Sequence, residues 1–413
     1  MVSKRTPTPA VSASWAERPL EMTQEQRLLT RPFVLCSVSN FLQGIAFCLF
    51  LHVPGFYAEL GASPVVIGWM FAAMSAVAIG IRPALGTVMD RYGRRGPILF
   101  GNLLNVVVIA LYLTVDHIGA WALVVRILHG VSGAILFTVL FTFAADCVPT
   151  QRLTEGLAIF GVSGMAPMSI GGMLGDAILK DGSYSTLFLW AWGFAVLALL
   201  TALPLHDVAR RSPGPSKPIG FMGTFKQRDL LPLWWIGGVF FAAMTGIFIF
   251  LKTFIMTREV GSVGMYFAGY TAVAVVLRLF LGWLPDRIGP VRVLIPALLV
   301  FAVGFGVLAV AQTAEMVVAA GVLGGIGHAY TFPILFGMVV KRASEQQRGS
   351  AMAIFTGLAD LGAVVGGPLF GWLLVRTGYG FLYGALAVIV VLGLLVFLPW
   401  NARSVGASRA ESA

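Results

Sequence analysis

Long apolar stretches alternate with short polar segments along almost the whole chain of 413 residues. Each stretch holds roughly 20 mostly apolar residues, enough for a helix to cross the ~30 Å hydrocarbon core of a bilayer. A membrane barrel would instead show alternating polarity over segments of about ten residues. The pattern predicts an all-α membrane protein with twelve transmembrane helices, near 32–57, 64–89, 97–116, 119–146, 154–178, 184–205, 231–255, 263–285, 291–312, 316–340, 350–375 and 379–400.

The composition argues against a soluble protein. Hydrophobic residues make up 58% of the chain and charged residues 11%, whereas soluble domains carry about 25% charged residues. The sequence contains no Gly-x-x-x-x-Gly-Lys-Ser/Thr phosphate loop, so nucleotide hydrolysis is not expected. We therefore expect no enzymatic activity, no cofactor and no metal site. The first 30 residues lack the apolar core of a signal peptide.

Basic residues are distributed unevenly between the two sides of the predicted membrane. Of the 28 Lys and Arg residues, 21 fall on the side that holds both termini, and 3 fall in loops on the other side. Because cytoplasmic loops collect Lys and Arg, we expect a multi-pass protein of the plasma (inner) membrane with both termini in the cytoplasm. The same distribution accounts for the net charge of +10 without a nucleic-acid partner.

The longest internal connection divides the chain into two halves of six predicted spans each. It covers 206–230 and is rich in Pro, Gly, Ser and basic residues. We therefore expect a cytoplasmic tail over 1–31, a six-helix bundle over 32–205, a cytoplasmic linker, a second bundle over 231–400 and a cytoplasmic tail over 401–413.

The two halves repeat the same polar residues at equivalent positions. Five residues around the end of the second span recur 196 positions later around the end of the eighth: Arg82, Gly86, Asp90, Arg91 and Gly93 become Arg278, Gly282, Asp286, Arg287 and Gly289. The tripeptide Ala-Ile-Phe at 158–160 also recurs at 353–355, an offset of 195. Two six-helix pseudo-repeats are typical of secondary transporters, whose halves rock about a central site.

The loop after the second span resembles the signature loop of the major facilitator superfamily, through Gly86, Asp90, Arg91, Gly93, Arg94 and Arg95. The resemblance covers roughly residues 30–400 and implies that family's fold. It also implies a conformational latch between the halves. In that latch Asp90 faces the N-terminus of the eleventh span, Arg91 pairs with Asp146, and Gly282, Asp286, Arg287 and Gly289 form the second copy.

Two further motifs carry the resemblance. In the fourth span Arg126-Ile-Leu-His129-Gly130 is similar to the family's Arg-x-x-polar-Gly motif. The fifth span resembles the antiporter motif of the drug:proton branch, a helix-packing motif made here of Gly164, Pro167, Gly171 and Gly172. The sequence departs from that motif because Ala166 stands where Gly precedes Pro, and because three residues rather than two follow Pro167 before the Gly pair.

Polar side chains inside the spans are the candidates for proton coupling or substrate binding. Asp360 is the carboxylate nearest the middle of a span, where a charge is costly unless it has a partner or takes up a proton. It is therefore either a proton carrier or a structural carboxyl bonded to a neighbouring helix. Arg126 and Lys252 either hold an anionic group or reach towards the membrane surface. The other candidates are Asn40, Gln43, His129, His328 and Tyr330.

These features predict secondary active transport by alternating access. Aromatic residues make up 12% of the chain, and an aromatic cavity suits an amphiphilic organic substrate. We expect proton-coupled efflux of such a compound by an antiporter. One alternative is a symporter that imports a small organic anion, with Arg126 and Lys252 as counter-charges; another is a membrane sensor or scaffold without flux. The expected partners are a small-molecule substrate, protons and the lipid bilayer, and the expected state is a monomer.

Overall fold

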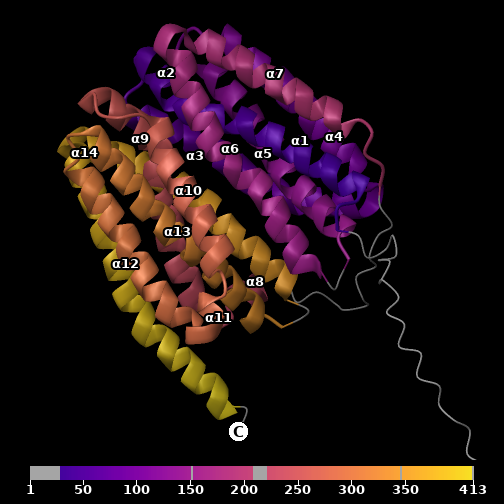
Figure 1. Cartoon of the computed structure of the whole chain (residues 1–413), viewed down its shortest axis with the longest axis vertical. Helices are drawn as coiled ribbons and strands as arrows, with labels where there is room; N and C mark the ends of the chain where they lie inside the picture. The colour runs from indigo at the N-terminus through magenta and orange to yellow at the C-terminus, as the bar shows by residue number, and fades with distance from the viewer. Residues whose placement is uncertain (1–27, 150–151, 208–220, 345–346, 412–413) are drawn as a thin grey trace, which may run out of the picture.

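The computed structural model describes residues 28–149, 152–207, 221–344 and 347–411, and these residues are almost entirely helical (Figure 1). Among them, eleven helices are long and apolar enough to cross a membrane. The last, Gly349–Ser404, is 56 residues long and contains Gly378, whose backbone is not helical (φ 79°, ψ 172°). It therefore holds two successive crossings, and the predicted all-helical membrane fold is confirmed.

The helices begin and end within a few residues of the predicted spans. The first half contains α1 (Arg31–Leu49), η2 (Phe50–His52), α2 (Val53–Glu59), α3 (Pro64–Tyr92), α4 (Arg95–Leu111), η3 (Tyr112–Thr114), α5 (Ala120–Cys147), α6 (Leu153–Asp181) and α7 (Tyr184–Ala202). The second half contains α8 (Phe221–Phe225), α9 (Leu231–Arg258), α10 (Val263–Leu281), α11 (Leu284–Ile288), α12 (Pro290–Ala309), α13 (Ala314–Arg342) and α14 (Arg348–Glu411). Of the predicted tails and linker, residues 1–27, 208–220 and 412–413 lie outside the described residues.

Local sequence explains where several helices begin and end. The side chains of Ser63, Ser183, Ser262 and Thr313 each accept a hydrogen bond from the backbone N–H three residues later and so cap α3, α7, α10 and α13. Glycine ends α3 at Gly93 (φ 90°) and precedes α12 at Gly289 (φ 97°). Both glycines belong to the repeated motif, which explains why the motif needs a residue that tolerates a positive φ.

Small residues bring α1 and α6 into close contact inside the first half. A Cβ atom added to Gly44 would lie 2.7 Å from Cγ of Pro167, and one added to Gly171 would lie 2.6 Å from Cβ of Cys48. Gly172 instead packs against the second half, where its added Cβ would lie 3.2 Å from Cα of Gly264. Close approach at small residues is the usual way in which membrane helices pack.

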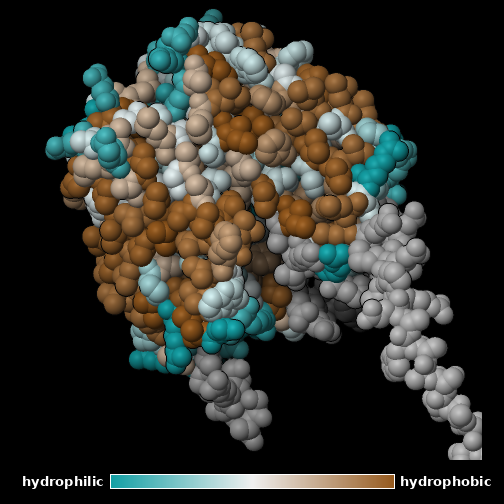
Figure 2. Space-filling view, viewed as in Figure 1, coloured by the Kyte–Doolittle hydropathy of each residue, from teal (hydrophilic) through white to brown (hydrophobic). Residues whose placement is uncertain are grey.

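The chain termini define two sides of the molecule. We call the side where α1 begins and α14 ends the terminal side, and the side where α3 begins at Pro64 the far side (Figure 1). Hydrophilic side chains gather at both ends of the molecule, and a hydrophobic belt covers the middle (Figure 2). This distribution is the one expected for a protein surrounded by lipid.

The two halves touch on the far side and separate towards the terminal side. On the far side a Cβ on Gly68 of α3 would overlap the carbonyl of Gly367 of α14, and Gly172 meets Gly264. On the terminal side of the same helices, added Cβ atoms at Gly86, Gly161, Gly349 and Gly357 would meet nothing within 4 Å. Figure 2 shows a recess between the halves in this region. The described conformation is therefore closed on the far side and open on the terminal side.

Candidate transport site

An ion pair joins the two halves where α3 meets α14. Nη2 of Arg82 lies 2.6 Å from Oδ2 of Asp360, and Nη1 of Arg82 donates to Oγ1 of Thr356 at 3.2 Å. The two charged side chains are 22% and 17% exposed, so the pair is largely shielded. The sequence pattern placed Asp360 near the middle of a span but did not identify Arg82 as its partner.

A second arginine crosses between the halves where α10 meets α6. Nη1 of Arg278 lies 2.6 Å from Sδ of Met165, and Nε donates to the carbonyl of Ala329 at 3.4 Å. Nη2 has no hydrogen-bond partner, and no carboxylate of the described residues forms an ion pair with this guanidinium. Arg278 is therefore a half-buried cation whose charge is not balanced by a neighbouring carboxylate.

Arg126 and His129 lie together inside the first half. They are 2% and 1% exposed, so Arg126 does not reach a water-exposed surface. Oη of Tyr112 accepts from Nη1 of Arg126 at 3.4 Å and lies 3.3 Å from Nδ1 of His129. The guanidinium also lies over the ring of Phe71 at 4.0 Å, a favourable cation–π contact. The two residues form an enclosed polar cluster rather than the wall of an open cavity.

Asn40 and Gln43 take part in hydrogen bonds between helices of the first half. Nδ2 of Asn40 donates to Oγ of Ser163 at 2.8 Å, which links α1 to α6. Oε1 of Gln43 accepts from Nδ2 of Asn105 at 3.0 Å, and Asn105 in turn accepts from Ser132 at 3.1 Å. These hydrogen bonds satisfy polar groups inside the first half, so Asn40 and Gln43 both connect helices in this conformation.

His328 and Tyr330 lie on α13 among aromatic residues of the second half. The His328 ring stacks on Tyr270 with centroids 5.6 Å apart and on Phe240 with centroids 5.7 Å apart. Tyr330 donates to the carbonyl of Leu281 at 3.5 Å. His328 and His129 therefore lie in different halves, each among its own aromatic neighbours.

A cluster of charged and polar groups closes the far side between the halves. Oδ2 of Asp176 accepts from the N–H of Gly264 at 2.5 Å, and Oδ1 of Asp176 lies 3.8 Å from Nδ1 of His52. The fully buried His52 ring is also 3.1 Å from the Gly172 carbonyl. Lys252 is half-buried beside α2, where Gly55 approaches it. The sequence pattern predicted no role for His52 or Asp176, because neither belongs to a motif.

The structure corrects one pair of the predicted latch. Asp146 pairs with Arg94 rather than with Arg91, through a 3.1 Å contact between Nε and Oδ2. The reason is the turn at Gly93, which carries Arg94 off α3 towards the end of α5, while Arg91 stays on the exposed face of α3, over the ring of Tyr92. The backbone N–H groups of Arg94 and Arg95 both donate to Oδ1 of Asp207, at 2.7 Å and 3.0 Å.

The described charged residues of the second latch copy do not join the halves in this conformation. The Asp90 side chain lies outside the described residues. In the second copy Asp286 and Arg287 are exposed, and Arg287 lies over the ring of Trp283 at 4.8 Å. Neither makes an ion pair with another described residue. This arrangement agrees with halves that are apart on the terminal side.

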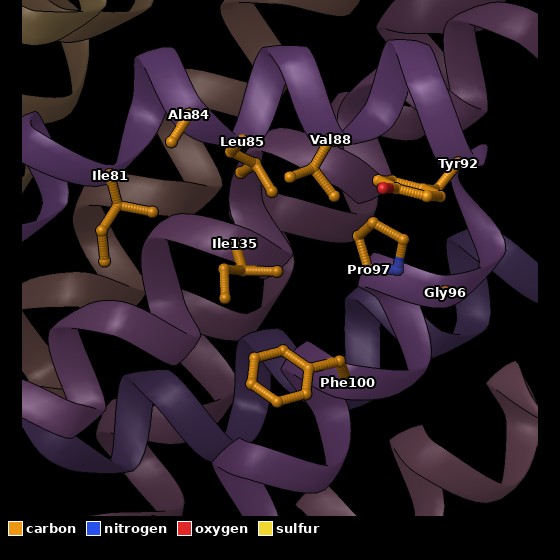
Figure 3. Close-up of a pocket in the computed structure, with 9 residues that line it drawn as sticks. All are labelled: Ile81, Ala84, Leu85, Val88, Tyr92, Gly96, Pro97, Phe100 and Ile135. Atoms are coloured by element: carbon orange, nitrogen blue, oxygen red, sulfur yellow. The ribbon is translucent and has the colours of Figure 1, made fainter.

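An apolar pocket of about 400 Å³ lies between α3, α4 and α5 (Figure 3). None of the charged residues described above lines it. Its walls are formed by Ile81, Ala84, Leu85, Val88, Tyr92, Gly96, Pro97, Phe100 and Ile135. The pocket belongs to the first half alone, so it lies apart from the contacts between the halves.

A family model of the Major Facilitator Superfamily matches residues 33–261 and 233–412. The described architecture and the repeated loop agree with this match. The chain belongs to this superfamily. It is therefore a multi-pass membrane protein of a family of secondary transporters, not of enzymes, and a small molecule is its substrate. Membership of the drug:proton branch is a finer assignment that the match does not make.

Two curated relatives of this superfamily member carry no substrate in their names. The chain is 23% identical over 355 residues to an uncharacterized MFS-type transporter, MJ1560, of Methanocaldococcus jannaschii, covering 83% of this chain and 91% of the relative. It is 26% identical over 377 residues to the uncharacterized MFS-type transporter YhhS of Escherichia coli, covering 88% and 90%. These relatives support the family and leave the substrate open.

Solved structures show the same fold at low identity. The nucleoside transporter NupG has a TM-score of 0.72 at 14% identity, covering 90% of this chain and 99% of that one. The human organic anion transporter MFSD10 has a TM-score of 0.65 at 18% identity, covering 89% and 99%. At such identities the likeness concerns the superfamily fold alone.

Proposed function

We propose that this transporter couples the movement of its solute to protons through Asp360. The observation that carries the proposal is the 2.6 Å ion pair that Asp360 makes with Arg82 across the two halves. A deprotonated carboxylate holds α14 to α3 through this pair. A protonated one carries no charge and holds Arg82 less strongly, because the Coulomb attraction between two opposite charges is lost. Protonation therefore changes the energy of a contact between the halves.

Alternating access makes such a contact a suitable coupling device. A ligand shifts a conformational equilibrium only by the difference between its binding energies in the two states. A proton on Asp360 meets this condition when Arg82 lies against it in one state and moves away in the other. In the described conformation the pair is partly exposed, and the terminal side of the halves is open.

Two directions of coupling follow from two kinds of solute. Aromatic side chains around the second half, such as Phe240, Phe332 and Phe355, support efflux of an amphiphile by antiport. Cotransport of a small organic anion has a more specific observation in its favour, because neither Arg126 nor Arg278 forms an ion pair with a carboxylate of the described residues. We therefore favour cotransport of a proton with an organic anion.

The sign of proton movement distinguishes the two reactions. Solutes whose cellular levels differ between a deletion strain and its parent would be added to proteoliposomes that contain a pH-sensitive dye. Cotransport should acidify the lumen as the solute enters, and antiport should make the lumen more alkaline. The Asp360→Asn variant at equal protein content is the control. Solute entry without any change in lumenal pH would contradict proton coupling.

We also propose that the terminal side faces the cytoplasm, because loops on that side carry most of the Lys and Arg residues. Trypsin added to intact spheroplasts should leave the 206–230 connection uncut, although Arg210, Arg211 and Lys226 provide cleavage sites. Inverted vesicles should be cut there, as judged by the size of the fragments. Cleavage in intact spheroplasts would reverse the orientation.

A further inference from the structure

The internal repeat relates the two interhelical contacts made by arginine. Arg82 of α3 and Arg278 of α10 are repeat partners at the offset of 196. Ala-Ile-Phe at 158–160 corresponds to 353–355, and five positions further on Met165 corresponds to Asp360. The pair Arg82–Asp360 therefore has a counterpart, Arg278–Met165, on the other side of the pseudo-twofold axis.

The structure places each arginine against its repeat-related partner. A guanidinium nitrogen of Arg82 lies 2.6 Å from the Asp360 carboxylate, and one of Arg278 lies 2.6 Å from the Met165 sulfur. Each arginine reaches from one half of the molecule to the other. The difference is chemical, because a carboxylate carries a negative charge and a thioether is only a weak acceptor.

This difference leaves Arg278 one negative charge short of its counterpart. An arginine side chain stays protonated in proteins, and a charge within the membrane is costly unless it is paired. The only other recorded bond of this guanidinium is the 3.4 Å contact with the Ala329 carbonyl, and Nη2 has no partner among the described residues. The side chain can therefore donate hydrogen bonds to an anionic oxygen group.

We propose that Arg278 binds the carboxylate or phosphate group of the transported solute, in the place that the Asp360 carboxylate takes against Arg82. This inference rests on the proposed transport function and names its substrate class. Arg126 is a weaker candidate, because it is 2% exposed and already contacts Tyr112 and Phe71. Arg278 lies instead at the contact between the halves and is only half-buried.

The surroundings of Arg278 suit the organic part of such an anion. Tyr270 lies on the same face of α10, about two turns before Arg278. His328 is next to Ala329 and stacks with Tyr270, while the Phe332 ring lies 5.9 Å from that of His328. The cation therefore stands beside a group of aromatic rings, so a small anion with a planar or apolar body can contact both.

The position of the site gives the anion a role in coupling. An anion on Arg278 displaces the Met165 sulfur and so alters the contact between α6 and α10. A proton on Asp360 weakens the equivalent contact between α3 and α14. The two ligands therefore act on the two symmetric contacts between the halves, which is the behaviour that cotransport requires.

Binding of defined anions to the purified full-length protein tests this inference. Benzoate and phenyl phosphate should raise the melting temperature of the wild type, and neutral benzamide should not, at matched ionic strength. Arg278→Gln should weaken anion binding by about tenfold or more, since a charge-assisted hydrogen bond is lost. Met165→Asp should do the same, because it supplies a carboxylate that competes for Arg278.

Two matched variants separate charge from shape. Met165→Asn has the same size as Met165→Asp without its charge and should bind the anions more tightly than the Asp variant. Arg376→Gln removes a far-side arginine that lies over Trp372, and it should bind them like the wild type. No stabilisation of the wild type by either anion, or undiminished binding by Arg278→Gln and Met165→Asp, would overturn the inference.

The measurement is made without a proton gradient, so it is independent of the proposed coupling. If anions bind at Arg278 and the Asp360→Asn variant still shows normal proton-driven transport, the coupling proposal is wrong and the anion site stands. If the Asp360→Asn variant loses coupling and no anion binds at Arg278, the coupling proposal stands and the anion site is wrong.

Discussion

Replacement of Asp360 by Asn should abolish proton-driven accumulation of the solute while exchange of solute across the membrane continues. Asn has nearly the same volume as Asp but cannot take up or release a proton. Arg82 then loses the negative charge that lies 2.6 Å away, so the contact between α3 and α14 no longer responds to protonation. We expect gradient-driven accumulation to fall at least about 100-fold, measured against solute counterflow at equal membrane abundance.

The control is a carboxylate that cannot contribute to coupling. Asp116 is 86% exposed in a far-side loop, where its recorded partner is the adjacent His117. Asp116→Asn should accumulate solute like the wild type. If Asp360→Asn also accumulates solute normally and keeps the wild-type pH dependence, the pair with Arg82 is structural and the coupling proposal is wrong.

Exchanging the charges of Arg82 and Asp360 tests whether the ion pair itself, rather than either residue alone, is needed for folding. Arg82→Asp combined with Asp360→Arg restores an ion pair between α3 and α14, so the double variant should be more abundant in the membrane than either single variant. Because the proton site then lies on α3 instead of α14, recovery of abundance need not bring recovery of coupling. The comparison therefore separates folding from transport.

The sequence predicted the spans because burial in lipid demands about 20 apolar residues in a row, a signal that needs no tertiary information. The repeated motif also coincides with two turns, where Gly93 and Gly289 both have positive φ. It did not predict that Arg94 would pair with Asp146 in place of Arg91, because the direction in which that turn leaves α3 decides which arginine points at α5.

The sequence pattern could not predict the partner of Asp360 either, for a different reason. Arg82 and Asp360 are 278 residues apart, and their contact depends on how the two halves pack. The repeat held a usable signal, since it contains an arginine in both halves but a carboxylate opposite only one of them. Asn40 and Gln43 show the opposite problem: a polar residue in a span looks the same in sequence whether it lines a cavity or bonds to a neighbouring helix.

Enlarging the side chain at Gly68 should drive the transporter towards a conformation that is open on the far side. A Cβ atom at this buried position on α3 would overlap the carbonyl of Gly367 on α14, so the backbones must move apart. Overpacking of this kind costs about 1–3 kcal/mol. A shift of about 2 kcal/mol changes the ratio of two conformations roughly 30-fold, and Gly68→Val should therefore reduce transport strongly.

The conformational shift can be measured with a thiol reporter. Gly357→Cys places a thiol on the terminal side of α14, where an added Cβ meets nothing within 4 Å. Maleimide applied from the terminal side should label this reporter readily in the otherwise unchanged protein and much more slowly when Gly68→Val is present. The native cysteines are replaced beforehand, since Cys147 is only half-buried.

Gly80→Val is the matched control for this experiment, because it makes the same change on the same helix at a position with open space around it. It should leave both transport and labelling near the values of the reporter protein. Equal labelling in the Gly68 and Gly80 variants would show that the contact between α3 and α14 does not close the far side. Slower labelling in the Gly68 variant alone would tie this closure to the opening of the terminal side, as movement of two rigid halves requires.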